Sequence, residues 1–341
     1  MALLEIRNLH LMLHSFEGRA HILNGIHLTV ERGEVWGLVG ETGCGKSVTG
    51  LSVSRLLASP PAEYAQGEIL FDGQDVLKAD EQTMRALRGR RIGMIFQDPT
   101  TNLNPVFRIS EQMIDVALHV ATHDPGLLGL ARNAGARDKR AAARSVAIQM
   151  LDKVGIPQAA ERVDLYPHEF SGGMRQRVLI AMALIGKPDL LIADEPTTAL
   201  DVSVQAQVLR LIHGLVQEFN LGVLLITHNL GVVAQVCTHV AVMYAGNIVE
   251  SGPVRAIFKR PGHPYTRALL RAIPAAHMKR GDLVGLAGTV PNLIAPPCGC
   301  RFAPRCELAR KVCSERVPPA VEVARGHQVH CVLAQPAIEV A

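Results

Sequence analysis

The sequence predicts an α/β fold built around a phosphate-binding loop, and three observations support this class. Short apolar runs typical of buried strands alternate with helical stretches over about the first 260 residues. One run, residues 35–39, leads through a glycine-rich turn into a predicted helix that begins near Lys46. Polar or acidic residues follow other runs, at the strand ends where open α/β folds bind ligands.

Composition places the chain among soluble globular proteins. Its 341 residues are enough for about two domains and a sizeable core. Apolar residues make up 48% and charged residues 19%, and the net charge of +4 is carried by scattered basic residues. Nucleic acid is therefore not an expected partner. The N-terminus lacks a signal-peptide layout, and the longest apolar runs fall well short of the ~20 residues that cross a bilayer.

Two strands are predicted before the loop, at residues 3–9 and about 21–30, followed by a turn at 31–34. Phe16 lies between these two strands. Its ring is either a stacking surface for an adenine base or an ordinary aromatic in a connecting loop.

The loop itself has the composition of a nucleotide site. Its glycines let backbone N–H groups turn toward phosphate oxygens, and the helix N-terminus adds its own N–H groups and partial positive charge. Lys46 is predicted to reach the β- and γ-phosphates, and the Ser47 hydroxyl to bind Mg²⁺. The predicted ATP-binding residues here are Gly40, Glu41, Thr42, Gly43, Cys44, Gly45, Lys46 and Ser47.

After the loop helix, Pro60-Pro61 interrupts the chain and residues 67–73 form a short predicted strand. A buried strand at 92–96 then ends at Gln97, which places this amide at the ligand-binding edge of a sheet. From about residue 110 to 165 the pattern is helical and Ala-rich, with no strand. This segment predicts a helical insertion in the α/β core.

A second candidate anion site follows the insertion. Ser171 is a plausible N-cap for an apolar helix at 178–184, and Gly172 and Gly173 allow close approach of the backbone to a ligand. Taken alone, the same residues also fit an ordinary helix start.

Two adjacent carboxylates end the next strand, residues 190–193. Side chains alternate along a strand, so Asp194 and Glu195 face different ways. We expect Asp194 to join the Mg²⁺ shell and Glu195 to be the general base that activates water for attack on the γ-phosphate.

Asp201 opens a further helix, and the apolar strand 221–226 ends at Thr227-His228. His228 at this sheet edge can hydrogen-bond the γ-phosphate and the base, although a lone histidine is more often structural. A hairpin of residues 240–244 and 248–251 closes the predicted core.

Together these motifs resemble the ATP-binding cassette (ABC) ATPases over about residues 1–260, with a helical subdomain at about 98–178. The order and approximate spacing of the loop, Gln97, Ser171-Gly172-Gly173, Asp194-Glu195, Asp201 and His228 carry the resemblance. It implies a head-to-tail pair of cassettes in which Ser171 and Gly173 contact the γ-phosphate held by the partner's loop. It also implies that Gln97 senses the metal and γ-phosphate. Met174 departs from the family pattern, where many cassettes have Gln.

Three further stretches are similar to the oligopeptide, dipeptide and nickel permease ATPases of bacteria: residues 195–207, the Phe96-Gln-Asp-Pro stretch with Leu103-Asn-Pro, and residues 263–270. That resemblance extends over nearly the whole chain and includes a C-terminal extension, residues 261–341. It implies an ATPase at the cytoplasmic face of the inner membrane, paired with a second, different ATPase subunit. Two transmembrane permease subunits and an extracytoplasmic solute-binding protein complete the implied importer.

Five cysteines lie close together in the sequence of the extension. Cys300, Cys306, Cys313 and Cys331 supply four thiols, a set that suits a Zn²⁺ ion or an iron–sulfur cluster, or that remains reduced in the cytosol. Similarity to permease ATPases thought to carry a [4Fe-4S] cluster here favours the cluster. Cys298 is the odd thiol and is an alternative ligand to Cys300.

Two other functions compete with import. One is a soluble cassette protein acting in DNA repair, on ribosomes or in iron–sulfur assembly. The chain has one phosphate loop, whereas ribosome-associated cassettes generally have two, and it lacks the long coiled coil or zinc insertion of repair cassettes. The other is a regulatory nucleotide-binding module without turnover, which Glu195 and His228 disfavour.

Overall fold

The computed structural model describes residues 2–131, 133–198, 200–273 and 285–334. It divides into two units. The first comprises residues 1–30, 34–77 and 225–341, and the second residues 31–33 and 78–224. Both contain helices and strands, which confirms the predicted α/β class.

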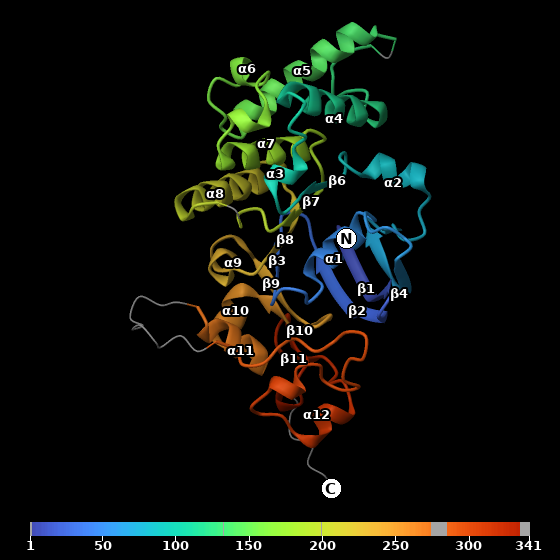
Figure 1. Ribbon diagram of the computed structural model, residues 1–341, viewed down its shortest axis with the longest axis vertical. Helices are drawn as coiled ribbons and strands as arrows, with labels where there is room; N and C mark the ends of the chain where they lie inside the picture. The colour runs from blue at the N-terminus through green and yellow to red at the C-terminus, as the bar shows by residue number, and fades with distance from the viewer. Residues whose placement is uncertain (1, 132, 199, 274–284, 335–341) are drawn as a thin grey trace. The chain divides into compact units, whose positions relative to one another are not determined.

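The first unit contains the phosphate loop and most of the strands (Figure 1). Its strands are β1 (Leu4–Ser15), β2 (Gly18–Val30), β3 (Val35–Val39), β4 (Ala62–Phe71), β5 (Gln74–Asp75), β9 (His239–Tyr244), β10 (Asn247–Pro253), β11 (Val321–Ala324) and β12 (His327–Val329). Its helices are α1 (Lys46–Val53), α9 (Leu230–Val236), α10 (Val254–Lys259), α11 (Pro264–Arg271) and α12 (Lys311–Glu315). Strand β8 (Gly222–Thr227) crosses from the second unit into the first.

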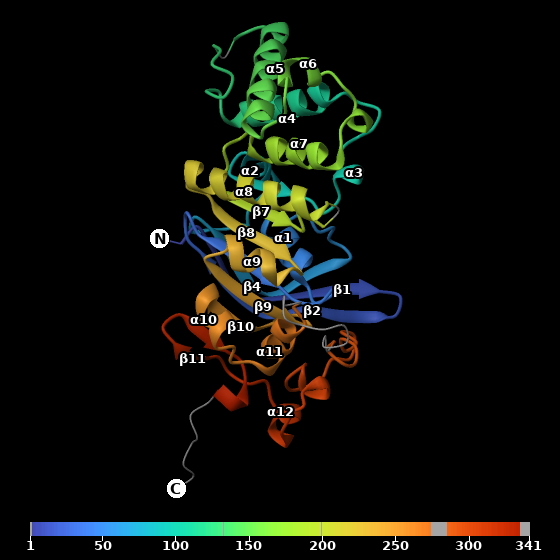
Figure 2. The same cartoon turned by 90° about the vertical axis from the view of Figure 1, so that its left-hand side faces the viewer.

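One antiparallel sheet of this unit has the order β2-β1-β4-β5. Figure 2 shows β1 and β2 running side by side, and their register ends at the pair Ser15–Gly18. Both strands therefore extend further toward the turn than the sequence predicted, because cross-strand pairing continues through the polar residues His14 and Ser15. The predicted strand at 67–73 also begins earlier, at Ala62, directly after the two prolines, and ends at Phe71.

The second group of strands in this unit follows the order β11-β12-β10-β9-β3. β3 pairs in parallel with β9, and β9 to β11 are joined by antiparallel pairs. Tyr244, Tyr265 and Phe302 pack edge to face or tilted against one another, with ring centroids 4.7 to 5.3 Å apart. All three rings are buried. The C-terminal region thus contributes Tyr265 and Phe302 to the same core as the β9–β10 hairpin.

The second unit holds the helical insertion. It contains the parallel strands β6 (Ile92–Ile95) and β7 (Leu190–Asp194), together with the helices α2 (Glu81–Leu87), α3 (Pro99–Asn102), α4 (Ile109–His123), α5 (Ala136–Lys153), α6 (Ala159–Arg162), α7 (Gly172–Leu184) and α8 (Val202–Phe219). Between β6 and β7 the described residues form helices and turns without a strand, as expected. In Figure 1, α4, α5 and α6 gather on one side of α7.

Candidate functional site

The phosphate loop joins β3 to α1, and two of its glycines, Gly40 and Gly45, lie close to neighbouring atoms. Gly40 has φ +156°, and a Cβ added there would lie 2.1 Å from the carbonyl oxygen of Met243. Gly45 has φ +105°, and its Cβ would lie 2.8 Å from Cε of the same methionine. Backbone of this kind is open to glycine and strained for any other residue.

Lys46 lies inside the loop. Its side chain is buried, and Nζ donates hydrogen bonds to the carbonyl oxygens of Gly40 (2.8 Å) and Glu41 (3.0 Å). The ammonium group is therefore fixed beside the N-terminus of α1, where the helix dipole also favours an anion. Ser47, next along the helix, is half-buried.

Glu41 is held at both its main chain and its side chain by residues from the C-terminal part of the chain. Its N–H donates to the Tyr265 hydroxyl (3.0 Å), and its carboxylate accepts two hydrogen bonds from Arg305 at 2.6 and 3.0 Å. No sequence motif assigns a role to Tyr265 or Arg305. Their only signal was that they lie in stretches similar to permease ATPases.

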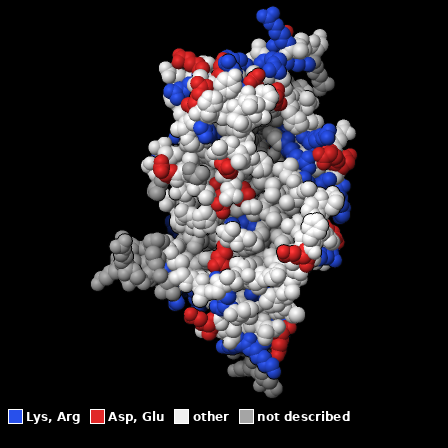
Figure 3. Space-filling model, in the orientation of Figure 1, with Lys and Arg blue, Asp and Glu red and all other residues white. Residues whose placement is uncertain are grey.

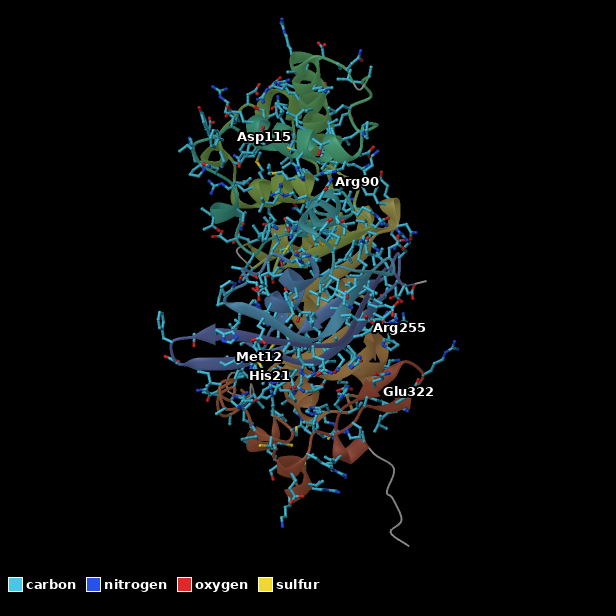
Figure 4. All side chains as sticks on the ribbon, turned by 90° about the vertical axis from the view of Figure 1, so that its right-hand side faces the viewer. Met12, His21, Arg90, Asp115, Arg255 and Glu322 are labelled. Carbon is cyan, nitrogen blue, oxygen red and sulfur yellow. The ribbon has the colours of Figure 1, made fainter. Side chains whose placement is uncertain are left out.

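Three other predicted residues belong to the same unit. Phe16 lies fully exposed in the turn between β1 and β2, close in sequence to Met12 and His21, which are labelled on these neighbouring strands in Figure 4. His228 is exposed just after β8. Cys44 is buried, and burial raises the pKa of its thiol. Contact of Phe16 and His228 with nucleotide stays a prediction.

Gln97 and Glu195 meet in the second unit. The Gln97 amide Nε2 donates to Glu195 Oε2 at 3.0 Å, and the Thr198 hydroxyl donates to the same oxygen at 2.8 Å. Glu195 has φ +46°, a left-handed conformation that is uncommon for a non-glycine residue. Asp194 is buried at the end of β7. Two of the three predicted catalytic side chains, Gln97 and Glu195, are thus in direct contact. Thr198 is a further partner of Glu195 that no sequence motif predicts.

The predicted second anion site lies at the start of α7. Ser171 Oγ accepts from the Met174 N–H at 3.4 Å, which confirms the predicted N-cap. A Cβ on Gly173 would lie 2.5 Å from Val204 Cγ1 of α8, so this glycine is needed for helix packing. Asp201 is exposed immediately before α8, which begins at Val202.

A model of the ABC transporter family matches residues 23–198, a range that includes both the phosphate loop and Glu195. The chain belongs to the ABC transporter family. A second model, described as the oligopeptide/dipeptide transporter C-terminal region, matches residues 249–313.

Curated relatives from this family are similar over almost the full length. A probable peptide ABC transporter ATP-binding protein, y4tR of Sinorhizobium fredii, is 46% identical over 96% of this chain and 94% of its own. The oligopeptide transport ATP-binding protein OppD of Bacillus subtilis is 43% identical over 98% of this chain and 89% of its own.

Solved structures of ABC cassettes share the fold. The dimeric ATP-binding cassette MJ0796 bound to ADP and Pi matches with a TM-score of 0.61 and 25% identity, over 74% of this chain and 99% of that chain. The chain is therefore an ABC-type ATPase, an enzyme that hydrolyses ATP, and ATP and Mg²⁺ are its expected ligands. Among the described helices, none is both long and apolar enough to cross a membrane.

The four cysteines singled out in the extension are among the residues that line one small cavity of about 20 Å³. Its lining is almost entirely apolar and includes Cys300, Cys306, Cys313 and Cys331, and burial raises the pKa of the Cys300, Cys306 and Cys331 thiols. Within the described residues, no three His, Cys, Asp or Glu side chains form a group that could hold one metal ion. The four cysteines thus share one cavity without forming a metal-binding group among the described residues.

Proposed function

We propose that this chain is the ATP-hydrolysing subunit of an ABC importer that takes up dipeptides, oligopeptides or a related small solute. The observation that carries this function is continuous similarity to peptide-transport ATPases through both the cassette and the C-terminal region. The soluble-cassette alternative gains no support from these relatives. Their names specify peptide transport rather than repair, ribosome or cluster-assembly work.

The side chains divide the chemistry as follows. Lys46 and the loop N–H groups would bind the β- and γ-phosphates, and Ser47 and Asp194 would ligate Mg²⁺ with help from Gln97. Glu195 accepts the proton of the water that attacks the γ-phosphorus as the bond to the ADP oxygen breaks. The Gln97 amide holds the Glu195 carboxylate in place, which supports this assignment. His228 bonds the γ-phosphate, Asp201 lies beside the nucleotide, and Phe16 stacks on adenine.

Each ATP site is completed in trans by Ser171, Gly172 and Gly173 of a second cassette at the start of α7. That partner is a different ATPase, so the working unit is a heterodimer. It sits on two permease subunits at the cytoplasmic face of the inner membrane, and an extracytoplasmic binding protein delivers the solute. On the face that Figure 3 shows, both acidic and basic side chains are present. No nucleic-acid partner is proposed.

Cys300, Cys306, Cys313 and Cys331 are proposed to hold a [4Fe-4S] cluster. Their convergence on one apolar cavity supports this, since such clusters are bound by four cysteine thiolates. The cavity is about 20 Å³, room for about one water, so a cluster would fit there only if the lining side chains moved apart.

Uptake of labelled peptides tests the transport function. In cells lacking this gene, the wild-type gene should restore uptake of labelled dipeptides or oligopeptides, and Lys46→Ala should not. Lys311→Ala is the matched control, because the Lys311 side chain is 93% exposed, and it should restore uptake fully. Restoration of another class of solute without any peptide uptake would overturn the proposal.

The cluster is tested on anaerobically purified protein. Iron, acid-labile sulfide and brown absorbance should all be present, and Cys306→Ser should lower all three. Cys298→Ser serves as control, because Cys298 is exposed and lies outside the cavity lining. Absence of both iron and sulfide from the wild-type protein would rule the cluster out.

A further inference from the structure

A short segment of the C-terminal extension reaches the phosphate loop. Between Cys300 and Cys306 the chain carries Arg301 and Arg305, and both guanidinium groups point toward the loop or its supporting turn. The Arg305 side chain is only 6% exposed. Its Nη1 and Nη2 donate to the two carboxylate oxygens of Glu41. This bidentate geometry fixes the orientation of the carboxylate and places a positive charge beside it.

Arg305 is itself held in one orientation. Its Nε donates to the carbonyl oxygen of Ala287 at 2.8 Å, and Nη2 also donates to that of Leu286 at 3.3 Å. Nη1 donates to the Tyr244 hydroxyl at 3.3 Å. A planar guanidinium that is hydrogen-bonded at all three nitrogens has little rotational freedom. Arg305 therefore holds the Glu41 carboxylate in one orientation.

Glu41 is one of the loop residues that enclose Lys46. Its carbonyl oxygen accepts from Lys46 Nζ, and its N–H donates to Tyr265, while Arg305 binds its carboxylate. Movement of the carboxylate would therefore move the peptide units that orient the ammonium group. Without Arg305 the carboxylate would also stand as an uncompensated negative charge in the loop that must receive a triphosphate.

Arg301 supports the loop from a second direction. Its Nη1 donates to the carbonyl oxygens of Ala245 (2.5 Å) and His21 (3.1 Å), and the residue is 5% exposed. The next residue of that turn, Gly246, donates its N–H to the carbonyl oxygen of Cys44 at 2.9 Å. The same segment lines the cysteine cavity with Cys300 and Cys306. One stretch thus contacts both the thiols and the loop.

We propose that Arg305 is a positioning residue of the ATP site, which holds Glu41 and neutralises its charge so that the phosphate loop accepts MgATP. Arg301 supports the same loop, and the C-terminal extension is thereby a working part of the nucleotide site. The inference rests on the proposed ATPase role of the loop but not on which solute is transported.

Equilibrium binding of MgATP to the full-length chain tests this. Arg305→Ala should weaken MgATP binding about tenfold, because it removes one partner of a charge pair that is buried on the arginine side and partly buried on the carboxylate side. It should raise KM more than it lowers kcat. Adding Glu41→Gln to Arg305→Ala removes the unpaired charge, so the double variant should bind MgATP more tightly than Arg305→Ala alone. Arg305→Lys, which keeps the charge but not the fork, should fall between wild type and Arg305→Ala.

Arg325→Ala is the matched control, since Arg325 is exposed in the turn between β11 and β12 of the same unit. It should bind MgATP like wild type. A folded Arg305→Ala within twofold of wild-type affinity would overturn the proposal, and so would a double variant no better than the single one. If Arg305→Ala does not fold, the comparison is made between Arg305→Lys and Arg305→Lys/Glu41→Gln. Wild-type protein that fails to bind MgATP would instead count against the ATP site itself.

Discussion

Glu195 is fixed by two donors on one carboxylate oxygen, and this arrangement fits a base that must not turn away from its water. Gln97 and Thr198 both bind Oε2. The left-handed backbone at Glu195 is of the kind that persists at functional sites because surrounding contacts enforce it.

Glu195→Gln should keep MgATP binding and lose turnover by about 10²- to 10⁴-fold, the usual contribution of a general base. The amide keeps the size of the side chain but does not take up the proton. Phosphate release by the assembled complex measures the effect. Glu161→Gln, an exposed change on α6, is the control, and undiminished hydrolysis in Glu195→Gln would remove Glu195 from the base role.

Gly40→Ala should destabilise the loop by about 1–3 kcal/mol, because its left-handed backbone is strained for alanine and the new Cβ would meet the Met243 carbonyl oxygen. MgATP affinity should fall with it. Thermal unfolding and MgATP binding of the full-length chain are the measurements. Gly214→Ala is the matched control, because nothing lies within 4 Å of a Cβ at that position on α8. Equal behaviour of the two variants would contradict the packing argument.

At the level of elements, helix α11 begins at a buried histidine. His263 Nδ1 accepts from the Tyr265 N–H at 3.1 Å, so the ring is a neutral N-cap. Burial lowers the pKa of His263 to about 3. The cap therefore starts the helix whose Tyr265 holds the phosphate loop.

Stability should fall on acidification because of this histidine. In the unfolded chain His263 takes up a proton as the pH falls below its ordinary pKa of about 6.5. In the native state it is protonated only near pH 3. The native state therefore has its full stability above pH 6.5 and loses it as the pH falls toward 3, by up to about 1.4 kcal/mol per pH unit.

His263→Asn removes this titration while keeping a side-chain oxygen for the cap. The free energy of unfolding of wild type minus that of the variant should shrink by about 2 kcal/mol between pH 6.5 and pH 5. Denaturant unfolding at both pH values measures it, with the exposed His213→Asn as control. A difference that does not change with pH would show that His263 titrates normally in the native state.

The sequence predicts secondary structure and helix caps well where they depend on residues close together in the chain. Residues 35–39, the loop and Ser171 were placed correctly because apolar runs, glycine spacing and N-caps depend on near neighbours. Strand ends were less accurate, since the pairing of β1 continues through polar residues. The bonds from Arg305 and Tyr265 to Glu41 could not be predicted. They join residues 264 and 224 positions apart, and neither residue type in its own stretch points to a phosphate loop.

For the whole molecule, pairing with a different ATPase has a direct test. In a pair of identical chains, mixing Lys46→Ala with Ser171→Arg would leave one site with an intact loop and an intact Ser171. Activity would then recover in the mixture. Pairing with a different subunit predicts no recovery, because each complex contains only one of the two defective chains. Phosphate release after co-expression measures this. Recovery toward about a quarter of wild-type activity would indicate identical partners, because half of the dimers are mixed and each of these has one intact site of two.

The distance in sequence between Glu41 and Arg305 also bears on the order in which the protein is made. Residue 41 leaves the ribosome early, but its guanidinium partner lies 264 residues later. During most of synthesis the phosphate loop therefore lacks the contact that fixes its carboxylate. We therefore expect full nucleotide affinity only after Arg305 has emerged, and a product truncated before it should compete for ATP more weakly.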